Sequence, residues 1–144
     1  MNQLIIQFAL SSVMVVLCLT IHGLGLFSLG AALRGEIAAE RLRKIDPLSL
    51  RGALFTLSIV LAMLALHGLE IWAFALAYLA IDAVPTIEEA LYFSTISYST
   101  VGYSDSHIAH EWRLVGAFES ILGIFLLGWS TAFFFRMLGR IEAH

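Results

Sequence analysis

Hydrophobic positions along the chain gather into three long runs, and most polar and charged residues lie between them. The runs cover residues 4–33, 53–81 and 114–138. Each is longer than the roughly 20 apolar residues with which a helix crosses the hydrocarbon core of a bilayer. The pattern therefore predicts three transmembrane helices.

A shorter apolar segment, residues 87–98, lies between the second and third runs. It is too short to span a bilayer, so we expect a re-entrant helix. Thr86 and Glu89 have the spacing of a capping box, with Pro85 just before them, which marks where the helix begins. The chain then has to return through the polar sequence TVGYS at residues 100–104. Backbone of this kind is tolerated inside a bilayer only where it packs in protein or lines a wet cavity.

The composition supports a membrane protein. Hydrophobic residues make up 60% of the 144 residues and charged residues 13%, whereas a soluble domain is nearer half apolar and a quarter charged. Cys18 is the only cysteine and lies inside the first run, which excludes a disulfide within the chain. No Lys or Arg precedes the first run, and it is too long for the apolar core of a signal peptide, so we expect it to be retained.

Lys and Arg predict the orientation of the chain. All but Arg113 lie in the connector between the first two runs or at the end of the third run. The positive-inside rule then places the connector and the C-terminus in the cytoplasm, and the N-terminus and the opening of the re-entrant segment outside. The basic residues are Arg34, Arg41, Arg43, Lys44 and Arg51 in the connector, with Arg136 and Arg140 at the end of the third run.

The sequence TVGYS and its surroundings resemble the tetrameric potassium-channel superfamily, whose selectivity filter reads TVGYG. The stretch HGLEIWAFALAYLAI resembles the outer helix, EALYFSTISYSTVGYSD the pore helix and filter, and WRLVGAFESILGIFLLGWSTAFFF the inner helix. The chain is most similar to short bacterial ion-channel-domain proteins with one extra N-terminal helix. The resemblance covers residues 53–138.

This resemblance implies an all-α membrane fold with three transmembrane helices, a re-entrant pore helix and a selectivity-filter loop. The chain divides into an extra N-terminal transmembrane helix at 1–33, a cytoplasmic basic loop at 34–52 and a pore domain at 53–144. One chain supplies one strand of carbonyl oxygens, so a closed ring needs several copies, and the superfamily implies a homotetramer. We expect a passive channel for K⁺ or another monovalent cation in a bacterial plasma (inner) membrane. We expect no enzymatic activity, no nucleic-acid partner, and no cofactor apart from potassium ions in the filter.

The resemblance also assigns the filter residues. The backbone carbonyls of Thr100, Val101, Gly102 and Tyr103 take the positions that replace the hydration shell of K⁺. The superfamily has a second glycine, with positive φ, where this chain has Ser104. A side chain costs about 1–2 kcal/mol in that conformation. Ser104 therefore adopts it with strain, or stabilises nearby backbone through its hydroxyl, or lets the outer filter relax and lose one ion site.

Three residues support the filter in the same resemblance. Asp105 takes the acidic position just outside the filter. Tyr92 takes one of the aromatic positions on the pore helix, and a hydrogen bond from Tyr92 to Asp105 is expected. Glu119 is expected to accept a hydrogen bond from Ser94 or Ser97 on the back of the pore helix, or to tune the occupancy of the filter, and the two roles are compatible.

The third run carries the candidate hinge and gate. Gly123 and Gly128 match positions at which the superfamily often has hinge glycines. Leu127 and Thr131 lie nearer the cytoplasmic end, where residues can form a hydrophobic constriction that gates by dewetting. Alternatively, Ser130 and Thr131 bond back to their own helix.

His67 and Glu70 lie three residues apart on the second run, and so on one face of a helix. An ionisable residue inside a membrane indicates function by default, and one interpretation is a pH-sensing or gating pair. The other is a hydrogen-bonded pair that pins this helix to the pore helix or to the first run. Metal binding needs a further ligand, for which His22 on the first run is the candidate.

Three alternatives to a selective K⁺ channel stay open. Ser104 opens the outer filter and gives a weakly selective cation channel. A non-conducting, channel-like membrane subunit keeps the pore scaffold for assembly. A membrane enzyme or metal transporter uses His22, His67 and Glu70, although the sequence has no nucleophile–base set and no HExxH-type spacing to support it.

Overall fold

The computed structural model describes residues 2–33, 49–102 and 104–142, and most of these are helical. The helices are α1 (Asn2–Ala32), α3 (Leu50–Ala80), α4 (Ile87–Tyr98), the short 3-10 helix η1 (His110–Trp112) and α5 (Arg113–Glu142). Three helices are long and apolar enough to cross a membrane: α1, α3, and α5 together with η1. No strand occurs among the described residues. The all-α fold with three spanning helices is therefore confirmed. Most of the predicted loop at 34–52 lies outside the described residues.

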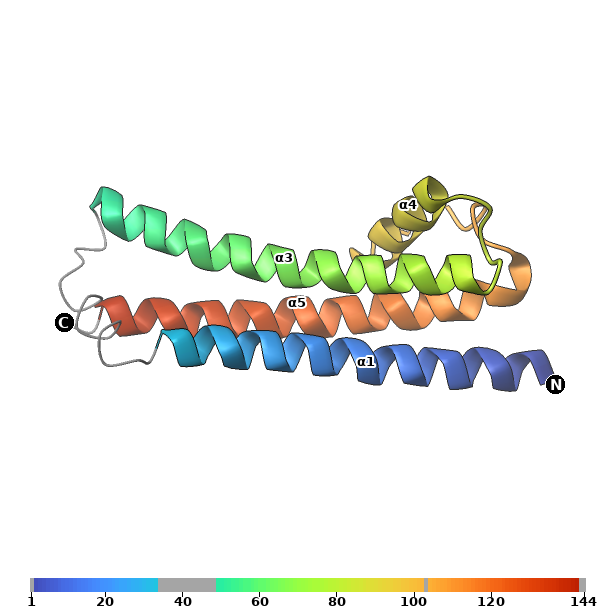
Figure 1. The fold of residues 1–144 in the computed structure, drawn as a ribbon, viewed down its shortest axis with the longest axis horizontal. Helices are drawn as coiled ribbons and strands as arrows, with labels where there is room; N and C mark the ends of the chain where they lie inside the picture. Colours follow the sequence, from blue (N-terminus) through green and yellow to red (C-terminus); the bar gives the residue numbers. More distant parts are fainter. Residues whose placement is uncertain (1, 34–48, 103, 143–144) are drawn as a thin grey trace.

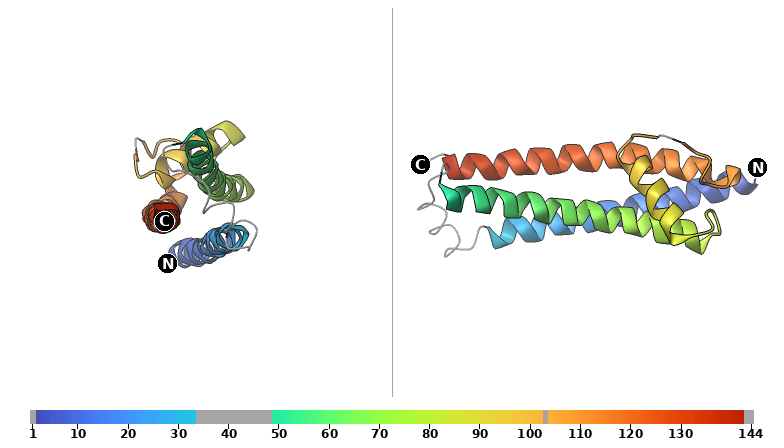
Figure 2. Two further views of the ribbon diagram at one scale, coloured as in Figure 1. Left: turned by 90° about the vertical axis from the view of Figure 1, so that its left-hand side faces the viewer. Right: turned by 90° about the horizontal axis from the view of Figure 1, so that it is seen from above.

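The three long helices lie side by side, and α4 is inclined to them near one end of the molecule (Figures 1 and 2). α1 and α5 run in the same direction, and α3 runs in the opposite one (Figure 1). The N-terminus and the loop after α4 therefore lie at one end of the bundle, and the end of α5 lies at the other. With three crossings, the two ends of the described chain lie on opposite sides of a membrane.

α1 packs on the other helices through one face. Its buried residues recur every three or four positions, as one side of a helix requires. Polar contacts fix its N-terminal end: the Gln7 side chain accepts a hydrogen bond from the backbone N–H of Leu114 (3.2 Å), and the Gln3 side chain donates to the carbonyl of Glu111 (3.1 Å). The first N–H groups of a helix lack partners within it, so Gln7 also serves as a cap for α5. The buried residues of α1 are Gln7, Ser11, Met14, Cys18, His22, Leu26 and Gly30.

The core consists of two apolar clusters. The larger lies at the end that carries α4 and includes Phe74, Tyr78 and Leu126. The smaller, toward the other end of the bundle, includes Ile59 and Phe133. A layer of buried polar side chains separates the two clusters, and it holds residues from all four main helices.

α4 begins where the capping pattern predicts. The Thr86 side chain accepts a hydrogen bond from the N–H of Glu89 (3.2 Å). Glu88 and Glu89 lie in the first turn, where the helix dipole favours negative charge. Among the described residues the Glu89 carboxylate does not return to the Thr86 backbone, as a full capping box requires, and accepts from the Thr86 hydroxyl instead (3.5 Å). The bounds Ile87–Tyr98 coincide with the predicted re-entrant segment.

Candidate functional site

The segment after α4 turns sharply and is exposed in the single chain. Thr100 and Gly102 have φ angles of 62° and 54°, in the left-handed region that a β-branched residue such as Thr rarely adopts. Two backbone bonds of 2.9 Å hold this turn to the end of α4, from Thr100 N–H to the Ser97 carbonyl and from Gly102 N–H to the Ile96 carbonyl. The last carbonyls of a helix have no partner within it, so the N–H groups of this turn cap the C-terminal end of α4.

Ser104 forms hydrogen bonds to its neighbour Ser106. Its hydroxyl accepts from the N–H of Ser106 (3.1 Å) and hydrogen-bonds to the Ser106 hydroxyl (2.7 Å). Of the possibilities drawn from the sequence, a hydroxyl that stabilises nearby backbone is therefore present. Tyr103 lies outside the described residues, and because the φ angle of Ser104 depends on Tyr103, strain at Ser104 stays a prediction.

Asp105 and Tyr92 have partners other than each other. Asp105 Oδ2 pairs with Arg113 Nε at 3.3 Å, and the Tyr92 ring lies edge-on to the ring of His107, with centroids 5.0 Å apart. No Tyr92–Asp105 hydrogen bond forms among the described atoms, so that expectation is wrong for the single chain. The physical reason is the guanidinium of Arg113, because a charged donor is a stronger partner for a carboxylate than a phenol.

Glu119 joins α5 to both α4 and α3. Its carboxylate accepts hydrogen bonds from the Ser94 hydroxyl (2.5 Å) and from the Tyr78 hydroxyl (2.6 Å), and all three side chains are buried. Ser94 is one of the two pore-helix serines expected as its partner. The Ser94 hydroxyl also lies 2.9 Å from the carbonyl of Ile71. Glu119 therefore ties the back of α4 to the two helices beside it.

The inner-helix glycines differ in their surroundings. A Cβ built on Gly123 would lie 2.0 Å from the carbonyl oxygen of Tyr98, so Gly123 lets α5 approach the end of α4 closely. No described atom lies within 4 Å of a Cβ built on Gly128. Leu127 and Thr131, the candidate gate residues, are exposed in the single chain, and the Thr131 hydroxyl bonds back to the Leu127 carbonyl (2.8 Å). α5 is one helix over this whole stretch, and the hinge role of its glycines stays a prediction.

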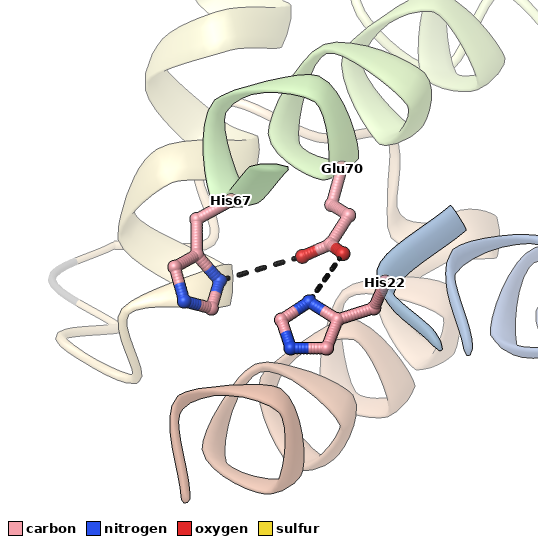
Figure 3. Close-up of side chains that lie close together, drawn as sticks. All are labelled: His22, His67 and Glu70. Carbon is pink, nitrogen blue, oxygen red and sulfur yellow. Dashed lines mark hydrogen bonds and ion pairs between the residues drawn. The ribbon is translucent and has the colours of Figure 1, made fainter. Parts of the chain in front are cut away.

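The buried polar side chains between the two apolar clusters, which we call the polar layer, are His22, His67, Glu70, Tyr98 and Ser130. His22 Nδ1 lies 2.8 Å from Glu70 Oε1, and His22 Nε2 lies 3.2 Å from the Ser130 hydroxyl. His67 Nδ1 lies 2.8 Å from the Tyr98 hydroxyl and 3.4 Å from Glu70 Oε2. The Tyr98 hydroxyl donates to Glu70 Oε2. Figure 3 shows the Glu70 carboxylate between the two imidazoles.

The polar layer thus matches the second interpretation of His67 and Glu70, in which the two form a hydrogen-bonded pair that holds their helix to its neighbours. Glu70 on α3 bonds to the first helix through His22 and to the pore helix through Tyr98. Ser130 extends the network to α5. The extra N-terminal helix is therefore hydrogen-bonded, through one buried carboxylate, to the residue at which the pore helix ends.

Sequence reasoning missed Tyr78, Tyr98 and Ser130 as members of these two networks. Hydroxyl groups inside a membrane segment need partners, and this was the available signal. Their partners lie 41, 28 and 108 residues away along the chain. Local spacing cannot identify partners at such separations.

A family model described as ion channel matches residues 53–140. The match takes in α3, α4, the loop after it and nearly all of α5, whereas α1 precedes it. Comparisons with curated proteins and with solved structures found no match. The matched region is more than half of the 144 residues and contains two of the three helices able to cross a membrane. The chain therefore belongs to the ion channel family and is a multi-pass membrane protein.

Proposed function

We propose that the chain forms a homotetrameric channel for K⁺, with the backbone carbonyls of residues 100–103 as its selectivity filter. The observation that carries this proposal is the turn after α4. Thr100, Val101 and Gly102 are exposed, and the first and third of them have positive φ. Exposed, irregular backbone at membrane depth is tolerated where it lines a water-filled cavity. Carbonyls from several chains around one axis would supply that lining and replace the hydration shell of the ion.

The direction of α4 supports a cation as the permeating species. The C-terminal end of a helix carries partial negative charge, and α4 has no basic residue in its last turn to offset it. Glu88, near the start of α4, and Asp105, after the turn, are both exposed. Negative charge at an opening raises the local concentration of cations.

The exposed face of α5 supports a pore that continues below the filter. Ile124, Leu127, Thr131 and Phe135 are exposed in the single chain. They are spaced by three or four residues and so lie on one side of the helix. Around a fourfold axis, this face would line the conduction path beneath the filter. Leu127 and Thr131 then remain the candidates for a constriction, with Gly128 beside them.

Ser104 supports a second candidate function, a cation channel with weaker selectivity. Its hydroxyl bonds to Ser106, whereas a second glycine has no side chain that could form this bond. This difference falls next to the outermost predicted carbonyl, that of Tyr103. A looser outer filter would lose one ion site, and with it part of the preference for K⁺ over Na⁺.

The reversal potential between K⁺ and Na⁺ across a bilayer tests both candidates. We expect wild type to show a K⁺ preference, and Ser104→Gly to raise that preference if the outer filter is relaxed. Ser12→Ala is the control, because the Ser12 hydroxyl is exposed on α1 and bonds back to the Phe8 carbonyl of its own helix. A reversal near zero that moves toward K⁺ only in Ser104→Gly would establish the weakly selective channel. A tetramer that passes no current with either sequence would support a non-conducting subunit.

A further inference from the structure

The polar layer brings together a set of metal-ligating atoms that ion conduction does not use. One nitrogen each from His22 and His67 and one carboxylate oxygen of Glu70 all lie within 4.8 Å of one another. His22 comes from α1, and the other two come from one face of α3 (Figure 3). The three donors therefore converge from two helices that are far apart in the sequence.

Two imidazoles and one carboxylate are a donor set that suits zinc with one position left open. Zn–N and Zn–O bonds are about 2.0–2.2 Å, so ligand atoms in a tetrahedral site lie roughly 3.3 Å apart. His22 Nδ1 is 2.8 Å from one oxygen of Glu70, and His67 Nδ1 is 3.4 Å from the other. Because these distances run to different oxygens, one ion held by both imidazoles would take the Glu70 carboxylate through both oxygens or after a small shift of one side chain. The Tyr98 hydroxyl bonds to His67 Nδ1 (2.8 Å) and to Glu70 Oε2, so an ion bound there would displace those hydrogen bonds.

The surroundings also fit a metal centre. A ligating histidine usually donates its other ring N–H to a polar group, which fixes the ring. His22 has such a partner, because its Nε2 lies 3.2 Å from the Ser130 hydroxyl. The side chains of His22 and Glu70 are fully buried. A divalent cation there would offset the charge of a carboxylate that is far from water.

A groove on one side of the bundle reaches one of the three ligands, His67. His67 retains slight exposure and forms part of the wall of a groove of about 340 Å³ between α3 and α5. Apolar side chains, among them Met63 and Leu127, make up most of the other walls. Because a water molecule occupies about 30 Å³, an ion with part of its hydration shell fits this groove.

We propose that His22, His67 and Glu70 form a binding site for a divalent transition-metal ion of the zinc class. The bound metal links α1 to α3 beside Tyr98, the residue at which α4 ends. This site is distinct from the carbonyl filter, and it stands whether or not the channel selects K⁺.

Cobalt binding to the full chain in detergent tests the site, because tetrahedral Co²⁺ absorbs visible light and Zn²⁺ displaces it. Wild type is expected to bind one Co²⁺ per chain with that absorption. His22→Asn and His67→Asn are expected to lose it, since an amide nitrogen donates a hydrogen bond but does not ligate metal. His110→Asn, at the exposed start of η1, is the control and should bind as wild type does. Ser130→Ala should weaken binding by about 10–100-fold, the usual effect of removing an outer-sphere partner.

Circular dichroism and size-exclusion chromatography establish that each variant keeps its helices and assembly. Asn at position 22 or 67 preserves a donor near the position of the Nδ1 atom, so at least one of these two variants should fold. Folded wild type without the Co²⁺ absorption would overturn the proposal and leave the polar layer as a hydrogen-bond network alone. Absorption that survives in both histidine variants, or that disappears in His110→Asn, would also overturn it.

Discussion

The carbonyl oxygen of Tyr98 lies against the backbone of Gly123, where a Cβ would come within 2.0 Å of it. The atoms that such a Cβ would meet are backbone atoms of Tyr98, so no side-chain rotation relieves the contact. The last residue of the pore helix and the inner helix therefore touch main chain to main chain. A glycine at position 123 is required by this packing whether or not the inner helix also bends there.

Gly123→Ala is expected to push α4 away from α5 and to destabilise the protein by about 1–3 kcal/mol, the usual cost of overpacking. Current should fall with it, because the filter follows directly after α4. Thermal unfolding in detergent and single-channel recording measure the two effects. Gly128→Ala is the matched control on the same helix, where a new Cβ meets no described atom. It should be neutral or slightly stabilising, since Ala favours helix over Gly by up to about 1 kcal/mol. Equal stability of the two variants would contradict the packing role.

Gly102→Ala separates backbone strain from crowding in the filter turn. No described atom lies within 4 Å of a Cβ built there, but φ is +54°, which costs an L-residue about 1–2 kcal/mol. Conducting channels should become rarer by about tenfold for each chain whose turn has to hold this conformation, because 1.4 kcal/mol is a factor of ten in population. Single-channel open probability measures this.

The control for that experiment is D-alanine at position 102, introduced by semisynthesis. A D-residue favours positive φ, so it should restore conduction while adding the same methyl group. Loss of current with D-alanine as severe as with L-alanine would show that the methyl group, and not φ, is the obstacle.

Removing Glu119 should affect Tyr78 more than Ser94. Ser94 has a second acceptor at the Ile71 carbonyl, whereas the Glu119 carboxylate is the acceptor that the structure gives the Tyr78 hydroxyl. Glu119→Ala leaves that buried hydroxyl unsatisfied, at a cost of about 1–3 kcal/mol. Glu119→Gln keeps a carbonyl oxygen and should lose less. In the Glu119→Ala background, Tyr78→Phe should recover part of the lost free energy of unfolding, because it removes the unsatisfied hydroxyl. In wild type it should give no such gain. Denaturant unfolding in detergent measures both.

The proposed orientation predicts which positions a membrane-impermeant maleimide can reach in intact cells. With Cys18→Ala as background, Asn2→Cys at the start of α1 should be labelled from outside. Gly139→Cys near the end of α5 should be labelled only after the membrane is permeabilised, since the basic residues favour a cytoplasmic C-terminal side. The reverse pattern would invert the topology and place the filter loop in the cytoplasm.

The helices could be predicted from the sequence, and their local signals explain why. Runs of apolar residues long enough to span a bilayer depend on composition alone, and the three spans follow them closely. The start of α4 is determined by the capping residue Thr86 and its neighbours within one turn, so it could be predicted correctly from them. Features that depend only on residues within one turn or one run do not depend on how the helices pack, so they can be predicted from the sequence.

The docking of the first helix could not be predicted in the same way. Its contacts join Gln7 to Leu114 and His22 to Ser130, each pair more than one hundred residues apart. Such pairs depend on the relative rotation and depth of two helices, for which neither sequence periodicity nor hydropathy gives a value. The sequence offered a stabilising hydroxyl at Ser104 but did not identify its partner. The bond to Ser106 is local, but a family pattern that has glycine at position 104 gives no partner for a hydroxyl there.

The polar layer also sets the depth at which α1 stands in the membrane. A helix that slides by one turn moves about 5.4 Å along its axis, and the residues one turn from His22 on the same face are Cys18 and Leu26. Either of them opposite Glu70 would leave the His22 imidazole and the Oε1 oxygen of Glu70 without the bond that joins them. A helix with a uniformly apolar surface has no preferred position along the membrane normal. α1 has one, because His22 has to lie at the depth of Glu70. His22 thus fixes the position of α1 along the membrane normal within the bundle, in register with the contacts that Gln3 and Gln7 make near its N-terminal end.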